Sequence, residues 1–204
     1  MRYPEQTFVI LPLKEEKMRK TILYLSFFIV IIFGAKATTG DKISLLITKA
    51  KEFYEKGDKD AAIHALENAI VEIKNTRKLT IKNLHLCKKI MGYQLIEKRD
   101  GNVLNSGDPL LVYFEPENFM VKSKNGKYEV WLSEDARLLD EKGKVLFEKK
   151  DWVSIHQEFD TPIFPLFFQD RITGIPPGKY RLEITLNDKL KGSFVTRVVE
   201  FSVK

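Results

Sequence analysis

One run in the sequence places three possible metal ligands or acid–base groups at alternate positions. His156, Glu158 and Asp160 would share one face of an extended strand, where imidazole and carboxylate groups could bind a metal ion or form a catalytic set. Alternating polar residues are also typical of the solvated face of a strand. We favour this second interpretation and expect neither a metal nor another cofactor.

A second acidic group, Asp108, Glu115 and Glu117, lies beside two turns and a β-rich run. Paired carboxylates can act as general acid and base, or hold calcium between strands. Asp108 is more simply a turn residue, and Glu115 precedes a proline at a strand end. The sequence has no nucleophile elbow, glycine-rich phosphate loop, Cys-x-x-Cys or His-Glu-x-x-His. We therefore predict that the protein is not an enzyme, with a small hydrolase using Asp108, Glu115 or Glu158 as an alternative.

Five aromatic residues are candidates for contact with a partner or ligand: Trp131, Trp152, Phe164, Phe167 and Phe168. Regular strands could not turn all of these side chains inward, and an exposed apolar patch marks an interaction site. A helical segment of the same chain could cover the patch, or a partner could bind there. The tryptophans would also suit a carbohydrate or cell-wall ligand.

The elements that carry these residues fall into two parts, which meet near residue 79. Residues 41–78 predict two helices, from about 42 to 55 and from about 58 to 74, joined at Gly57. Apolar residues recur in them at three- and four-residue steps, at Ile43, Leu46, Ile47, Ala50, Phe53 and Tyr54, and at Ala62, Leu66, Ala69, Ile70 and Ile73. These stripes predict an antiparallel hairpin.

The hairpin resembles the core of a single tetratricopeptide repeat. The resemblance rests on Phe53-Tyr54-x-x-Gly57-Asp58-x-x-x-Ala62-Ile63 followed by Ala69-Ile70. One such unit cannot bury its own apolar face, because repeat arrays need about three. We expect the hairpin to pack on the β part or on a partner, and not to form a peptide-binding groove by itself.

Residues 79–204 contain alternating apolar residues with turn residues every ten or so positions. We predict seven strands, over 79–97, 110–115, 128–139, 145–152, 163–172, 180–186 and 194–203, with a bulge or bend at Gly92. The predicted fold is therefore mainly β, a seven-strand immunoglobulin-like β-sandwich behind an antiparallel helix hairpin.

The β part also resembles a family of uncharacterised exported bacterial proteins that share a C-terminal β-sandwich. The matching residues are Leu84-x-Leu86-Cys87-x-x-Ile90-x-Gly92, Gly107-Asp108-Pro109-Leu110-x-Val112-Tyr113-x-Glu115, Asn118-Phe119, Gly174-Ile175-Pro176-Pro177-Gly178-x-Tyr180-x-Leu182 and Thr185-Leu186-x-Asp188. The resemblance covers about residues 80–204. It implies a fold and a location outside the cytoplasm, but no catalytic residue.

The N-terminal residues have the parts of a secretory signal. A basic run at 17–20 precedes the uncharged residues 21–35, and Ala35 and Ala37 follow as small residues two positions apart. As a helix the uncharged run spans roughly 22 Å, less than the ~30 Å hydrocarbon core of a bilayer. We expect residues 1–37 to be a targeting segment with its start at Met18 and cleavage near Ala37, or otherwise a retained inner-membrane anchor.

Charge and cysteine content narrow the choice of partner and compartment. The chain has 34 basic and 28 acidic residues, a net charge of +6. Residues 1–37 hold six of the basic and three of the acidic ones, which leaves 28 and 25, or +3, for the remainder. This argues against a nucleic-acid partner, which requires a concentrated basic face. The single cysteine, Cys87, excludes an intramolecular disulfide and is expected to be a buried thiol.

Together these patterns predict an exported protein, periplasmic or extracellular, that binds or scaffolds another envelope protein. The membrane would be contacted only through the N-terminal segment, if that segment is not cleaved. Carbohydrate or cell-wall binding and a small envelope hydrolase stay open as alternatives.

Overall fold

The computed structural model describes residues 38–204. The predicted targeting segment, with Met18, Ala35 and Ala37, lies outside these residues. Lys42–Lys204 form one compact unit that contains all but the first three residues of the two helices and all the strands described below. Neither of the two helices in the described part combines the length and the apolar character needed to cross a bilayer.

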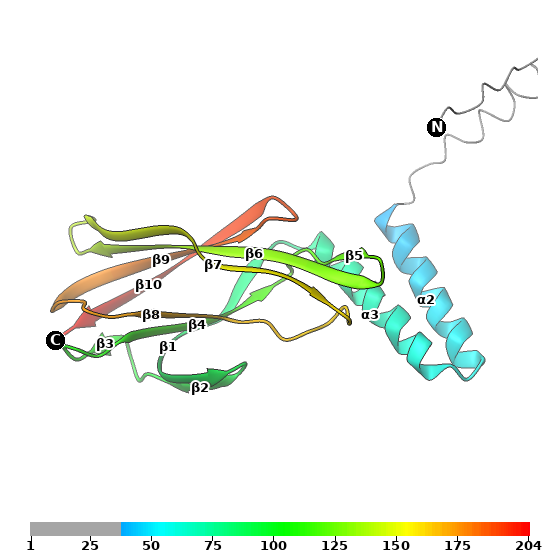
Figure 1. The fold of residues 1–204 in the computed structure, drawn as a ribbon, viewed down its shortest axis with the longest axis horizontal. Helices are drawn as coiled ribbons and strands as arrows, with labels where there is room; N and C mark the ends of the chain where they lie inside the picture. The colour runs from blue at the N-terminus through cyan, green and yellow to red at the C-terminus, as the bar shows by residue number, and fades with distance from the viewer. Residues whose placement is uncertain (1–37) are drawn as a thin grey trace, which may run out of the picture. The chain divides into compact units, whose positions relative to one another are not determined.

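Two helices open the described part, α2 (Thr39–Glu55) and α3 (Lys59–Thr76), as the sequence predicted. They are joined at Gly57, which has φ +83°, a left-handed conformation that glycine adopts without steric cost. Asp58 caps α3, because its carboxylate accepts a hydrogen bond of 3.1 Å from the Ala61 N–H. The chain therefore turns back on itself within three residues and forms an antiparallel hairpin (Figure 1).

The β part consists of two sheets, with ten strands in the described residues. One sheet has the order β2 (Leu95–Lys98), β1 (Thr80–Gly92), β4 (Leu110–Glu117) and β8 (Phe168–Ile172). The other has β3 (Val103–Leu104), β10 (Ser193–Val203), β9 (Gly178–Asp188) and β6 (Lys127–Asp140), with β5 (Lys122–Lys124) and β7 (Val145–Phe159) also paired with β6. Among the strands of residues 38–204, β7 pairs only with β6, and β8 only with β4.

The fold is mostly β behind two helices, as predicted, but three short strands were not foreseen. Strand β2 follows β1 in the chain and pairs with it antiparallel. The pairing has a register shift between Ile90 and Gly92, so the predicted bend at Gly92 is confirmed. Strand β3 has two residues and runs parallel to the end of β10. Strand β5 is Lys-Ser-Lys, in which no apolar residue marks a strand. Strands this short carry too little pattern to be read from sequence.

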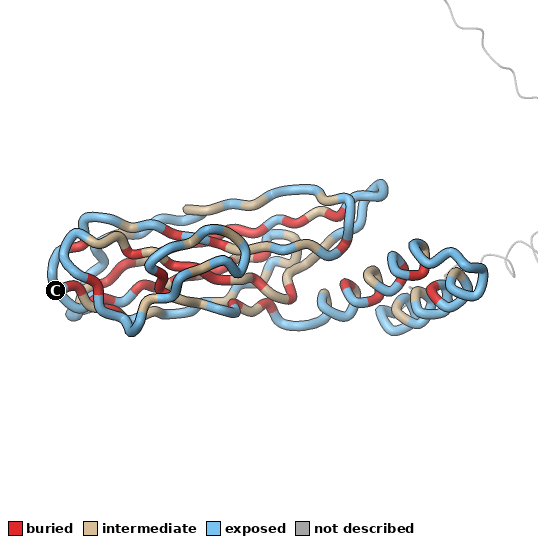
Figure 2. Tube along the Cα trace, turned by 90° about the horizontal axis from the view of Figure 1, so that it is seen from below, coloured by how far each residue is buried: buried red, intermediate tan, exposed pale blue. Residues whose placement is uncertain are grey.

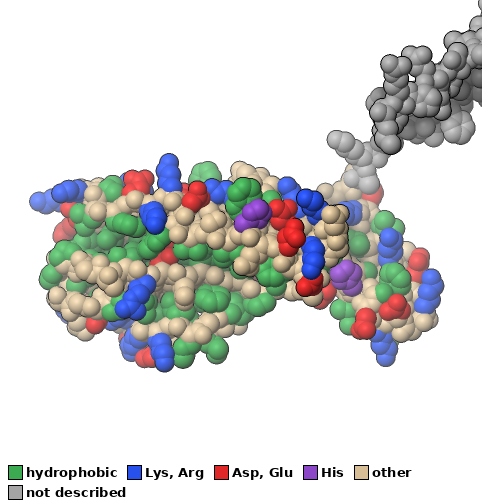
Figure 3. Space-filling model, viewed as in Figure 1, with side chains coloured by type: hydrophobic (Ala, Val, Ile, Leu, Met, Phe, Trp, Pro, Cys, Tyr) green, Lys and Arg blue, Asp and Glu red, His purple; other side chains and the backbone are tan. Residues whose placement is uncertain are grey.

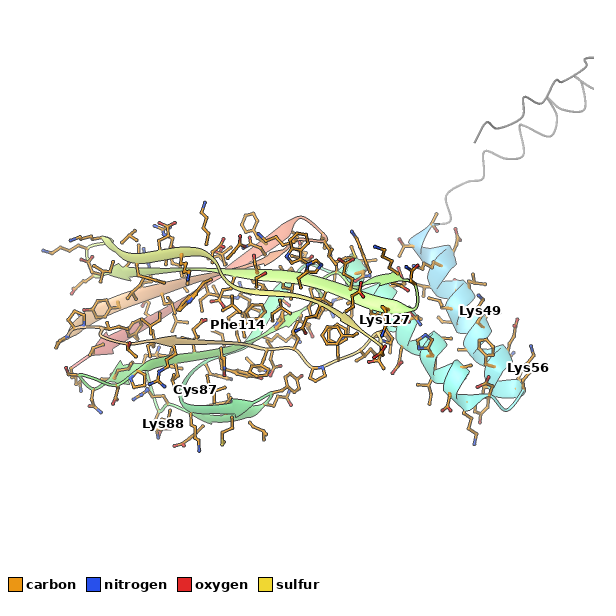
Figure 4. All side chains as sticks on the ribbon, in the orientation of Figure 1. Lys49, Lys56, Cys87, Lys88, Phe114 and Lys127 are labelled. Atoms are coloured by element: carbon orange, nitrogen blue, oxygen red, sulfur yellow. The ribbon has the colours of Figure 1, made fainter. Side chains whose placement is uncertain are left out.

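The core lies between the two sheets. Inward side chains alternate along the long strands, and the second sheet contributes Val130, Leu132, Ala136, Leu138, Leu182, Ile184 and Leu186. From β4, Phe114 projects between the layers and stacks on Phe168 of β8, with ring centroids 5.0 Å apart (Figure 4). Figure 2 shows the buried positions following these strands. Cys87 is fully buried, as predicted, and burial raises the pKa of its thiol.

Candidate functional site

The hairpin contacts the sandwich through polar side chains of α3. The Tyr128 hydroxyl at the start of β6 donates to Asn68 Oδ1, and it lies 3.0 Å both from that oxygen and from His64 Nε2. Since the single hydroxyl proton goes to Asn68, His64 Nε2 is left to donate to the Tyr128 oxygen. His64 and Asn68 are four residues apart and therefore share one face of the helix.

A second set of bonds fixes the end of α3. The Asn75 side chain donates to the Val121 carbonyl (3.1 Å) and accepts from the Val121 N–H (3.0 Å), in the manner of a strand partner. Lys191 Nζ donates to the Asn75 and Arg77 carbonyls, at 2.8 and 2.6 Å. The orientation of α3 is thus set by hydrogen bonds, which are more directional than apolar contact.

This orientation leaves many apolar residues of the hairpin exposed. Of the apolar residues predicted to form a stripe on helix α3, only Ala62 and Ala69 are buried, at 5% and 4% exposure, while Ala65 and Val71 outside that prediction are buried as well. Ile43, Leu46 and Phe53 are half-buried, but seven other large apolar side chains of α2 and α3 are 43–67% exposed, namely Leu45, Ile47, Tyr54, Ile63, Leu66, Ile70 and Ile73. Four of them, Ile63, Leu66, Ile70 and Ile73, recur at three- and four-residue steps, and we call these the α3 stripe. Figure 3 shows hydrophobic side chains among the charged ones on the hairpin.

A hollow of about 170 Å³ lies where α3 meets the sandwich. It is smaller than the roughly 300–1,000 Å³ of sites for small organic ligands, so it has room for a side chain and not for a cofactor. Helix α3, strands β1 and β4 and the segment before β8 form its wall, with Val71, Lys74, Asn75, Lys82, Tyr93, Glu115, Pro116, Glu117, Asn118, Phe119, Val121, Pro162, Ile163, Phe164 and Leu166.

The two acids that line the β side of this hollow, Glu115 and Glu117, are both hydrogen-bonded to neighbouring side chains. Tyr113 donates a hydrogen bond of 2.7 Å to Glu115 and accepts one of 3.0 Å from the Gln94 N–H. Burial, together with the bond to Glu115, raises the pKa of Tyr113 to about 12. Lys82 lies 2.9 Å from Glu117, and this bond lowers the pKa of that carboxyl group. Each of these side chains is fixed by a hydrogen bond or an ion pair to a neighbour, so none of them forms a free acid–base pair.

The predicted phenylalanines separate into two groups. Phe164 lines the hollow and stacks on Phe159 with centroids 3.7 Å apart. Phe167 is half-buried and stacks on Tyr113 at 5.5 Å. Phe168 is 1% exposed within the core, so its prediction as a binding residue is wrong. The reason is strand alternation, which turns Phe168 inward where Phe167 faces the other way.

The two tryptophans do not form one surface. Trp131 is 39% exposed and stacks on His156 with ring centroids 4.6 Å apart, while His156 Nε2 lies 2.9 Å from a Glu129 carboxylate oxygen. Trp152 is half-buried, packs against the core and meets Phe147 edge to face at 5.2 Å. Trp131 alone therefore offers part of an aromatic face to solvent.

The predicted acidic residues lie in separate places. Asp108 accepts from the Asn105 N–H at 3.1 Å in a turn. Glu115 lies on β4 and Glu158 on β7, in different sheets, while Asp160 pairs with Lys127. Across residues 38–204, no three histidine, cysteine or acidic side chains gather in the way a metal ion requires.

A pair of buried acids, Glu134 and Asp170, was not predicted from the sequence. Glu134 on β6 is fully buried and Asp170 on β8 is 3% exposed. Burial and the nearby Asp170 raise the pKa of Glu134 to about 10, and burial raises the pKa of Asp170 to about 6. A signal was present, because Glu134 occupies an inward position between Leu132 and Ala136 in an otherwise apolar series.

Comparisons with known proteins show only distant similarity. No protein family and no curated protein sequence matches the chain. Among solved structures, a family 123 glycoside hydrolase from Clostridium perfringens has 14% identity and a TM-score of 0.35, over 62% of this chain and 27% of that one. This chain therefore spans about a quarter of that enzyme.

Two smaller structures are comparably distant. The PmoD soluble domain from Methylocystis has 13% identity and a TM-score of 0.30, over 60% of this chain and 99% of that one. A CARDB domain from Pyrococcus furiosus, solved with two metal ions, has 13% identity and a TM-score of 0.29, over 62% and 86%. At such scores these likenesses carry no argument about function.

Proposed function

We propose that this protein is a non-catalytic binding or scaffolding protein of the cell envelope, and that it binds a partner protein through the exposed face of its hairpin. The observation that carries the proposal is the α3 stripe, whose four large aliphatic side chains are 43–55% exposed. Contiguous exposed apolar side chains with polar neighbours are typical of protein–protein contact sites.

The hollow beside α3 supports the same proposal. Lys74 lines the hollow and lies four residues after Ile70 of the α3 stripe, so the two features are neighbours on one face of the helix. A pocket with room for one side chain, next to an apolar surface, is the usual setting of an interface anchor residue. A partner that lies on the stripe could place one side chain in the hollow, against Phe164 and Phe119.

Two further parts of the proposal concern location and fold type. The secretory pattern at residues 18–37 supports export. The strand order supports an immunoglobulin-like sandwich. In one sheet β1, β4 and β8 are ordered as strands A, B and E are in that fold. In the other sheet β10, β9, β6 and β7 are ordered as strands G, F, C and C′ are. Sequencing the N-terminus of secreted protein tests export, and a mature chain that begins before Thr21 would contradict cleavage.

The binding proposal is tested with a stripe variant and a matched control. The partner is identified by cross-linking to the tagged full chain, then purified and titrated against each variant. Leu66→Asp with Ile70→Asp should weaken binding by about 30- to 800-fold, since each anchor contributes roughly 1–2 kcal/mol. Phe194→Asp changes an apolar side chain that is 71% exposed on β10 and should leave the affinity unchanged. Equal affinities for all three proteins would contradict the proposal.

A carbohydrate or cell-wall ligand is the second candidate, and Trp131 is the observation that favours it. Its indole is part-exposed beside the polar pair His156 and Glu129, and sugars stack on aromatic faces with polar groups at their rims. Soluble glycans should then shift tryptophan fluorescence in the wild type but not in Trp131→Ala. The same shift in both proteins would exclude Trp131 as the site.

A further inference from the structure

The pair Glu134 and Asp170 joins the two sheets through the core. Glu134 projects inward from β6, and Asp170 from β8 in the opposite sheet. Each carboxyl group is close enough to the other to affect its pKa, and within residues 38–204 none of their four oxygens has a hydrogen-bond partner. Buried carboxyl groups normally have cationic or N–H partners, and a proton shared between the two acids is what would satisfy this pair.

The surroundings of the pair are apolar. The strand register places Val153 of β7 and Leu186 of β9 beside Glu134, and Val112 of β4 beside Asp170. None of these residues titrates. Asp135, the next residue on β6, is the one further charged group whose field acts on Glu134, and it also favours the protonated form. Ionisation of both acids would leave two uncompensated negative charges in the core.

Strand β8 is short and lies at the edge of its sheet, and Phe168 anchors it in the core together with Asp170. It has five residues and, within residues 38–204, pairs only with β4. Phe168 and Asp170 are its buried side chains. The segment that immediately precedes β8 contributes Ile163, Phe164 and Leu166 to the wall of the hollow. Movement of β8 away from β6 would therefore open that wall.

We propose that Glu134 and Asp170 act as a proton-dependent latch, which holds β8 and the adjoining hollow wall closed while they share a proton and releases them when that proton is lost. In the open form both acids meet water and ionise in their ordinary range. Opening therefore releases one proton at pH values above the usual pKa of a carboxyl group and below the raised pKa of the closed pair. The latch acts on the hollow itself, and so it does not depend on the identity of a partner.

The test is hydrogen exchange of the full chain as a function of pH, corrected for intrinsic exchange rates. Between pH 6 and 9 the opening equilibrium of β8 should rise about tenfold per pH unit, or about 1,000-fold in all, because one proton is released. Amides of β9 and β10 should keep their protection. Glu134→Gln keeps the size of the side chain but cannot ionise, and its β8 amides should show no such rise.

Two further variants make the result decisive. Asp170→Asn should also lose the steep dependence, which shows that both members are needed even if one variant folds poorly. Glu129→Gln, a change on the outer face of the same strand, should behave as the wild type does. The proposal is overturned if Glu134→Gln keeps the wild-type slope, if all strands open together, or if calcium ions restore the protection of wild-type β8 at pH 9, which would identify an ion site.

Discussion

The position of the hairpin on the sandwich depends on Asn75, and Asn75→Ala tests how firmly the two are joined. The side chain makes two hydrogen bonds with the Val121 backbone, at 3.0 and 3.1 Å. Its removal deletes both bonds and leaves a part-buried N–H and carbonyl without partners. Each lost bond costs about 1 kcal/mol, and the unpaired groups add to this, so we expect a loss of about 2–4 kcal/mol.

The assay is urea unfolding of the full chain together with hydrogen exchange of α3. If hairpin and sandwich unfold together, the free energy of unfolding falls by this amount and Tm drops by about 5–15 °C for a unit of this size. If the hairpin detaches first, the amides of α3 lose protection while those of β9 and β10 keep theirs. Either result would show that Asn75 holds the junction.

Two control variants sharpen the Asn75 experiment. Thr76→Ala removes a hydroxyl that bonds only to the Ile73 carbonyl of its own helix, and should change stability by less than about 0.5 kcal/mol. Asn75→Asp keeps the acceptor for the Val121 N–H but loses the donor, so its effect should lie between the wild type and Asn75→Ala. A loss below about 0.5 kcal/mol for Asn75→Ala, with unchanged exchange, would refute the reasoning.

Three further variants or probes address the core and the turn. Phe168→Ala should lower the free energy of unfolding by about 3–5 kcal/mol in urea titrations, because it leaves a cavity beside Phe114, and a loss below 1 kcal/mol would speak against the packing. Cys87 is fully buried, so maleimide should label it only in denaturant, and rapid labelling of the native chain would contradict its burial. Gly57→Ala should cost about 1 kcal/mol in thermal unfolding, since φ is +83° there, and an unchanged Tm would count against that conformation.

The helices and strands with a long hydrophobic pattern could be predicted from the sequence. So could the turns that are determined by the types of their own residues. Gly57 and Asp58 define the hairpin turn, and the alternation from Tyr180 to Leu186 defines β9. These features depend on neighbours in the chain. Strand β3 could not be predicted, because it is a strand only through its parallel pairing with the end of β10, about a hundred positions away.

The site was less predictable, because it depends on which faces meet in space. Alternation alone does not say whether Phe167 or Phe168 faces the core, and a shift of one residue exchanges them. The pairing of Glu134 with Asp170 joins opposite sheets and has no local signal beyond one acid in an apolar series. The two tryptophans illustrate the same limit, since a bulge in β7 places Trp152 against the core.

The exposure of the α3 stripe is informative because the opposite arrangement was possible. An amphipathic helix normally turns its apolar stripe to the core, where full burial of an Ile or Leu contributes about 1.5–3 kcal/mol. Here the buried side chains of α3 are small or short, namely Ala62, Ala65, Ala69 and Val71. Beside them His64, Asn68 and Asn75 make hydrogen bonds that contribute only about 1 kcal/mol each.

The hairpin is therefore oriented by hydrogen bonds, and its large apolar side chains on α3 stay partly exposed to solvent. A covering partner would recover that burial, because about half of each stripe side chain is still exposed. Substitution of Leu66 and Ile70 by Asp should consequently weaken partner binding while lowering the stability of the isolated chain by only about 1.5–3 kcal/mol, because about half of each side chain is buried. A loss of stability well above this value would instead mean that the stripe belongs to the protein's own core.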